Sequence, residues 1–137
     1  MNKHWIFIFL VTFIYQLSFC QPSLKNKDDT TNYIINLMYT NGEVTTKGIG
    51  VGGETSKQYS RFVYLITLKN SDELLKLAEA SSGCVRVYAY MGLLYKGYSQ
   101  LKEIKNKLLK DQTQLNTRTG CMRETTMVNL LIKGIKN

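Results

Sequence analysis

The chain has 137 residues, a length that suits one ordinary domain, and 18 lysines and arginines outnumber 10 aspartates and glutamates for a formal net charge of +8. This charge favours acidic partners or anionic surfaces, although it also serves solubility alone. The sequence contains a single histidine, His4, and a single tryptophan, Trp5. Catalytic chemistry based on imidazole therefore depends on whether the N-terminal segment is kept.

Residues 1–20 have the pattern of a secretory signal peptide. A basic head that includes Lys3 precedes an apolar run, and Ser18 and Cys20 then occupy the −3 and −1 positions of a cleavage site after Cys20. The run is shorter than the roughly 20 apolar residues that a spanning helix needs. We therefore expect a periplasmic or secreted location after cleavage of the signal peptide, and a mature domain over 21–137. Cleavage would remove His4 and with it Ser-His pairs, Cys-His pairs and zinc sites built on imidazole.

Cys20 also supports a second interpretation. Residues 17–20 resemble a bacterial lipobox, in which the cysteine becomes a lipidated N-terminus. The residue before such a cysteine is normally small, and here it is Phe19. Simple cleavage is therefore favoured, with a lipid anchor at Cys20 as the alternative.

The first half of the mature chain predicts three short helices separated by one loop. Asp28 and Asp29 precede a helix that ends at Asn41, and a glycine-rich loop follows over 42–54. Thr55 or Ser56 can cap the second helix. Asn70 can cap the third, with a glutamate three residues later that completes a capping box.

The second half predicts further helices around a buried centre. Ser82 can cap a helix over 85–95 that is apolar on nearly all sides, which predicts that it is the central and most buried one. An amphipathic helix over 99–110, a polar loop over 111–120 and a last helix near 127–134 complete the pattern. The expected fold is therefore all-α, a small right-handed stack of helical hairpins with five or six helices.

The helical hairpin at 70–95 carries a family resemblance. Val85, Arg86, Ala89, Gly92 and Leu93 follow the V-R-x-x-A-x-x-[AG]-L pattern of a HEAT-repeat second helix, in which the small residue allows close helix approach. Over 70–121 the chain resembles poorly characterised HEAT-like secreted proteins of Gram-negative bacteria, in which an Asp-Thr-like loop ending in Gly-Cys follows. The resemblance implies a scaffold and no activity. It also implies that Arg86 lacks its usual aspartate, because Ser82 stands there.

Candidate binding residues come from the glycine-rich loop, the tyrosines and the lysines. The glycines at 48, 50 and 53 match a dinucleotide fingerprint, but we expect no strand before them and therefore no cofactor. The loop is still long enough for a binding loop. The candidate partner-binding residues are Gly50, Gly52, Tyr90, Tyr98, Lys102 and Lys105. The tyrosines would contribute only if they are exposed, because core packing is their commoner role.

Cys84 and Cys121 are predicted to form a disulfide. Export would allow oxidation, and these two cysteines are the ones that remain in the mature chain. In a helical hairpin, the start of the fourth helix and the loop after the fifth helix return to the same end. A buried free cysteine is the alternative.

These observations favour a non-catalytic exported protein-binding module without a metal or cofactor. The narrower hypothesis is an inhibitor or immunity protein that neutralises a secreted antibacterial toxin; the partner would be an acidic toxin or an envelope protein. Nucleic acid is not expected, since no recognition motif accompanies the basic charge. Two alternatives stay open: an envelope lipoprotein with a structural role, and a small histidine-free hydrolase that uses carboxylates.

Overall fold

The computed structural model describes residues 27–135, and the signal peptide and Cys20 predicted above lie outside this range. The chain divides into two units, Met1–Thr30 and Thr31–Asn137, and the fold presented here is that of the second unit. Among the described residues, no helix is long and apolar enough to cross a membrane.

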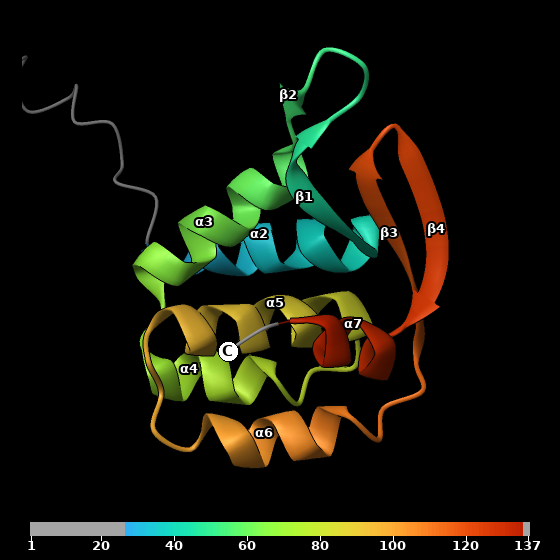
Figure 1. The fold of residues 1–137 in the computed structure, drawn as a ribbon. Coiled ribbons are helices and arrows are strands. Elements are labelled where there is room, and N and C mark those ends of the chain that lie inside the picture. Colours follow the sequence, from blue (N-terminus) through green and yellow to red (C-terminus); the bar gives the residue numbers. More distant parts are fainter. Residues whose placement is uncertain (1–26, 136–137) are drawn as a thin grey trace, which may run out of the picture. The chain divides into compact units, whose positions relative to one another are not determined.

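Six helices and four strands make up the described part of the chain (Figure 1). The helices are α2 (Lys27–Asn41), α3 (Lys57–Leu68), α4 (Ser71–Leu77), α5 (Gly83–Tyr95), α6 (Leu101–Leu108) and α7 (Val128–Gly134). The strands are β1 (Glu43–Ile49), β2 (Glu54–Thr55), β3 (Gln114–Gly120) and β4 (Met122–Met127). The prediction of an all-α stack of helical hairpins is therefore wrong, and the fold is mixed α/β.

The strands form one mixed sheet in the order β2-β1-β3-β4. β1 and β3 are parallel, and each continues into an antiparallel neighbour, β2 and β4 respectively. The connection between the two parallel strands contains α3 to α6, as a parallel crossover requires a long helical link. The glycine-rich loop over 42–54 and the polar loop over 111–120 were thus predicted wrongly, because each contains a strand at the centre of the sheet.

Helix α5 occupies the centre of the fold, as its apolar sequence predicts. It contacts α3, α4, α6 and α7 and also β1 and β3. Val85, Tyr88, Ala89, Tyr90 and Leu93 of this helix are completely buried. The sequence prediction of a buried central helix is confirmed.

The helix boundaries follow the predicted caps. Ser56 caps α3, Ser82 caps α5, and Asn70 caps α4 with the reciprocal bond from Glu73. Gly92 provides the predicted close approach: a Cβ there would lie 2.9 Å from Ile66 of α3 and 3.1 Å from Leu74 of α4. The hairpin of α4 and α5 is therefore real, although it belongs to a different fold from the one expected.

Arg86 has a partner that the family resemblance did not supply. Its Nε donates to Asp111 Oδ2 at 2.7 Å, and its two terminal nitrogens donate to Thr113 Oγ1 and to the carbonyl oxygens of Ala80 and Ser81. Asp111 also accepts from the backbone N–H of Thr113. The Asp-x-Thr segment thus joins the start of β3 to the central helix.

Candidate functional site

The two hairpins of the sheet project side by side at one edge (Figure 1). Since β1 and β3 are parallel, their carboxyl ends meet there, and each strand continues into a tight turn. The backbone N–H of Gly50 donates to the carbonyl of Gly120 at 2.9 Å, which ties the two turns together. Residues 50–53 and 120–122 are called the hairpin tips below.

The hairpin tips expose apolar side chains next to glycines whose backbone lies in the left-handed region. Gly50 and Gly120 have φ values of 73° and 55°, in the left-handed region. Between and beside these glycines, Val51 is 99% exposed and Met122 is 64% exposed. Scattered exposed apolar residues are common, but two at the ends of coupled tight turns make a protruding apolar feature.

One face of the sheet presents two rows of polar side chains. Residues directly opposite in neighbouring strands share a face, as do residues two apart along a strand. The registers place Glu43, Asn116 and Thr125 in the first row. They place Thr45, Arg118 and Arg123 in the second row. These six side chains are called the polar face.

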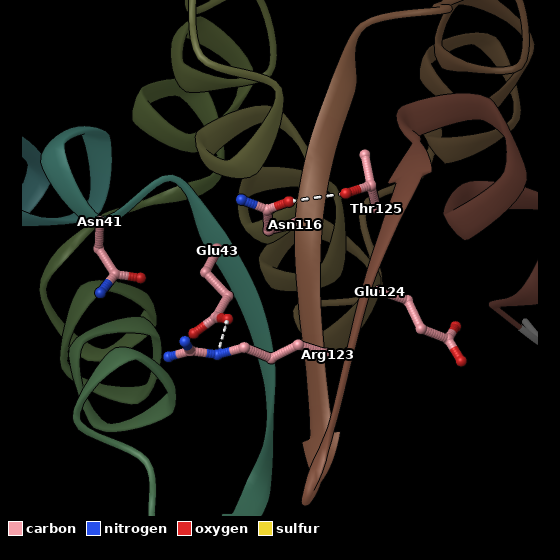
Figure 2. A pocket seen from close by; sticks show the side chains of 6 residues that line it. All are labelled: Asn41, Glu43, Asn116, Arg123, Glu124 and Thr125. Atoms are coloured by element: carbon pink, nitrogen blue, oxygen red, sulfur yellow. Dashed lines mark hydrogen bonds and ion pairs between the residues drawn. The ribbon is translucent and has the colours of Figure 1, made fainter.

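Ion pairing and hydrogen bonding hold the first row in place. Arg123 Nε donates to Glu43 Oε1 at 3.2 Å, and Thr125 Oγ1 donates to Asn116 Oδ1 at 3.1 Å. Figure 2 shows the Arg123 side chain reaching from β4 toward Glu43 on β1. The Glu43 side chain is only 12% exposed, whereas that of Arg123 is 68% exposed. The pair therefore has one shielded partner and one accessible partner.

A polar pocket of about 330 Å³ lies over this row, and its lining also includes Asn41 and Glu124. Figure 2 shows Glu124 pointing away from Glu43. The two carboxylates that line the pocket therefore do not converge on a common point, as a carboxylate-dependent hydrolase would require. Amide, hydroxyl and guanidinium groups dominate the pocket, and such groups recognise polar or anionic surfaces.

The second row contains one buried guanidinium nitrogen without a hydrogen-bond acceptor. Arg118 Nε is buried without a hydrogen-bond acceptor among residues 27–135. Its neighbour Thr45 already shares a hydrogen bond with Ser56, and its neighbour Arg123 already pairs with Glu43. The described part of the chain thus supplies no counter-ion to Arg118.

The opposite side of the sheet has a different character. A pocket of about 520 Å³ lies among Val44, Val87, Met91 and Leu131, with threonines of β1 and β3 at its border. Its apolar lining comes from β1, α5 and α7. One lysine and one glutamate, Lys47 and Glu124, also line it.

A buried hydrogen-bond network joins the sheet to the helices. The backbone N–H of Thr45 donates to the Tyr88 hydroxyl at 2.8 Å, and Cys84 Sγ donates to the Glu43 carbonyl at 3.2 Å. Gln58 donates to Cys84 Sγ at 3.4 Å. Burial raises the pKa of Tyr88 to about 12 and that of Cys84 to about 12. These groups stay protonated at neutral pH and position β1.

The structure separates the candidate residues of the sequence analysis. Gly50 and Gly52 lie in the hairpin tips. Tyr90 is completely buried in α5, and Tyr98 is half-buried with its hydroxyl donating to Gln100. Tyr90 therefore cannot contribute to a surface contact, because core packing determines its position.

Lys102 and Lys105 lie on α6, which packs on α5 and α7. Figure 1 shows α6 and the hairpin tips at opposite ends of the view. Lys105 also donates from Nζ to the carbonyl of Ile135 at 3.4 Å. The candidate binding residues Gly50 and Gly52 therefore lie on a different surface from Lys102 and Lys105.

The predicted disulfide between Cys84 and Cys121 is absent, and both cysteines are free. Cys84 is buried in α5, whereas Cys121 is exposed in the tip between β3 and β4. The segment before Cys121 forms a strand instead of a loop, so it carries Cys121 out to the end of a hairpin. The helical hairpin of α5 and α6 does form, but β3 separates Cys121 from its end.

The glycine pattern at 48–53 also needs a correction. A strand, β1, does precede these glycines, contrary to the expectation. The segment then turns back into β2 and pairs with β1 in antiparallel fashion. A dinucleotide fingerprint requires a helix directly after the glycines, and here the glycines form a hairpin turn.

Sequence reasoning missed Glu43, Asn116, Arg118 and Arg123 as a group. Threonines at 117, 119, 125 and 126 and the Gly-Cys turn were the available strand signals. Comparison with known proteins found no matching family model and no curated relative with a significant match. The resemblance to HEAT-like secreted proteins over 70–121 stays a prediction.

Proposed function

We propose that this chain is a non-catalytic protein-binding module that contacts its partner through the hairpin tips. The observation that carries the proposal is the exposure of Val51 and Met122 at the ends of two turns that share a backbone hydrogen bond. An apolar side chain presented in this way gains roughly 1.5–3 kcal/mol when a partner buries it completely.

The geometry of the tips lowers the entropic cost of binding. Each turn is short, begins with a glycine in the left-handed region, and is fixed to the other turn at Gly50 and Gly120. Little conformational freedom is then lost on association, which leaves more of the burial energy for affinity. The tips suit insertion into a concave partner surface.

The proposal includes export and a narrower role as an inhibitor or immunity protein for an antibacterial toxin. The N-terminal sequence pattern supports export, and the net charge of +8 supports an acidic partner. The apolar hairpin tips can insert into a cleft of the toxin. The arginines of the polar face can then contact acidic residues beside that cleft.

Site-specific photo-crosslinking in cells tests the proposal. A photoreactive amino acid at position 51 or 122 should capture the same partner, whereas the same group at Tyr95, which is 77% exposed on α5, should not. Equal capture from all three positions, or no capture from the two tips, would contradict the proposal. Deleting the gene should also sensitise the cell to a competitor or to its own effector.

A further inference from the structure

A cavity on the helix side of the sheet gathers apolar side chains that the core covers only in part. Val44 of β1, Met91 of α5 and Leu131 of α7 pack against the core and also line this cavity of about 520 Å³. Tyr59 of α3 and Ile135, the residue after α7, extend the same lining. A hollow of this volume with an apolar lining and a few polar groups is the usual form of a small-molecule site. It is called the sheet–helix cavity below.

Two charged side chains of opposite sign line the same cavity. Lys47 comes from β1 and Glu124 from β4. The register places Glu124 opposite Thr117 and Thr117 opposite Val44, so Glu124 shares a face of the sheet with the apolar lining. Neither Lys47 nor Glu124 forms an ion pair with any of residues 27–135. Both charges are therefore available to a ligand in the cavity.

We propose that the sheet–helix cavity binds a short apolar peptide with free termini. The apolar side chains of the peptide leave water against the apolar lining, which is favourable. Its carboxylate pairs with Lys47 and its ammonium group with Glu124. A carboxylic acid with an apolar tail would match Lys47 but place a second anion near Glu124, and an apolar amine would do the reverse. A zwitterion balances both charges.

The arrangement of the strands sets the length of the peptide. β3 lies between β1 and β4, the two strands that carry the charges. Neighbouring strands are about 4.8 Å apart, so the backbones of β1 and β4 are separated by roughly 10 Å. An extended peptide spans about 3.3–3.6 Å per residue, so the ends of a tripeptide have a similar separation. A free amino acid carries both charged groups on one carbon atom and is too short.

The cavity is separate from the hairpin tips, because residues 50–53 and 120–122 do not line it. Peptide binding therefore goes beyond the protein-binding role and does not depend on it. Crosslinks at positions 51 and 122 test the tips, whereas peptide titration tests the cavity, so each proposal can fail while the other stands.

Titration of the whole chain with trivaline, followed by NMR, tests the apolar part of the site. The methyl signals of Val87, Met91 and Leu131 report on the cavity. We expect saturable shifts at these methyl groups and none at Leu109, which is 36% exposed at the end of α6. Triglycine has the same charges without apolar side chains and should bind at least about tenfold more weakly. Equal affinity for the two peptides, shifts that do not saturate, or shifts as large at Leu109 would overturn the proposal.

Blocked peptides test the two charges one at a time. We expect N-acetylation and C-amidation of trivaline each to weaken binding by about threefold, because each removes one ion pair. In Glu124→Gln the acetylated and free peptides should bind equally, and in Lys47→Met the amidated and free peptides should do so. The controls Glu103→Gln and Lys102→Met, both at exposed positions of α6, should keep the wild-type differences. Blocked peptides that bind wild type as tightly as free trivaline would overturn the assignment of a zwitterionic ligand.

Discussion

At the scale of single residues, Asp111 joins the segment before β3 to the central helix through Arg86. Burial alone raises the pKa of Asp111, but hydrogen bonds from Arg86 and Thr113 and the charge of Arg86 outweigh it and hold that pKa below its usual value. The ion pair is well shielded, with side-chain exposures of 13% for Arg86 and 15% for Asp111. The charged form of Asp111 therefore stabilises the folded state.

Asp111→Asn should lower the free energy of unfolding by about 1–3 kcal/mol at neutral pH, since a charge-assisted hydrogen bond is lost. A depressed folded pKa gives stability that is complete above the unfolded value of about 3.9 and that disappears as the pH falls through the folded pKa. The difference between wild type and Asp111→Asn in urea unfolding should therefore shrink on acidification. A difference that is constant between neutral and strongly acidic pH would contradict this assignment.

The two described cysteines should differ sharply in reactivity. Desolvation raises the pKa of the Cys84 thiol to about 12, although a hydrogen bond from Gln58 opposes the shift. At pH 8 its thiolate fraction is about one in 10,000, and the side chain is also buried. Peptide mapping after alkylation should show rapid modification of Cys121 in the native protein and of Cys84 only after unfolding. Finding the two residues as one cross-linked peptide would show instead that they are bonded.

At the scale of secondary-structure elements, the Tyr88 hydroxyl is one of two side-chain groups of α5 that form hydrogen bonds with β1. Tyr88 accepts the backbone N–H of Thr45 in a buried position, and the Tyr88 ring stacks on Phe62 of α3 at a centroid distance of 5.1 Å. The ring packing and the hydrogen bond together fix the central strand β1 against the helices.

Tyr88→Phe should lower the free energy of unfolding by about 1–3 kcal/mol, because the ring remains and a buried N–H loses its acceptor. Tyr95→Phe is the matched control, since the exposed Tyr95 ring should change stability by no more than about 0.5 kcal/mol. Denaturant unfolding of both variants measures the difference. Equal stability of the two variants would mean that water replaces the lost hydroxyl.

The elements divide into those that the sequence predicts and those that it does not. Helices α3, α4 and α5 begin at the residues whose side chains cap them, because capping is local chemistry between residues two or three apart. The strands were missed because β1 contains one of the glycines, Gly48, and β3 is mostly polar. Their stability comes from pairing between segments about 70 residues apart, such as Glu43 with Asn116, which local patterns do not report.

At the scale of the whole described unit, the same long-range pairing explains why the candidate site was predicted only in part. Gly50 and Gly52 were identified because glycine-rich loops are visible in the sequence, and the structure places them in the hairpin tips. The polar face could not be predicted from sequence patterns, because Glu43, Asn116 and Arg123 become neighbours only when β1 and β3 pair in the parallel register. Tyr90 was misplaced, since helical spacing does not tell which tyrosine faces the core.

The affinity of the crosslinked partner for tip variants tests the central claim most directly. Calorimetry should compare wild type with Val51→Asp, Met122→Asp and the control Tyr95→Asp, and thermal unfolding should confirm that all four remain folded. We predict a loss of affinity of at least about tenfold for each tip substitution and no change for Tyr95→Asp, because a buried apolar contact at the centre of an interface is worth more than about 1.4 kcal/mol. Unchanged affinity in both folded tip variants would contradict binding through the hairpin tips.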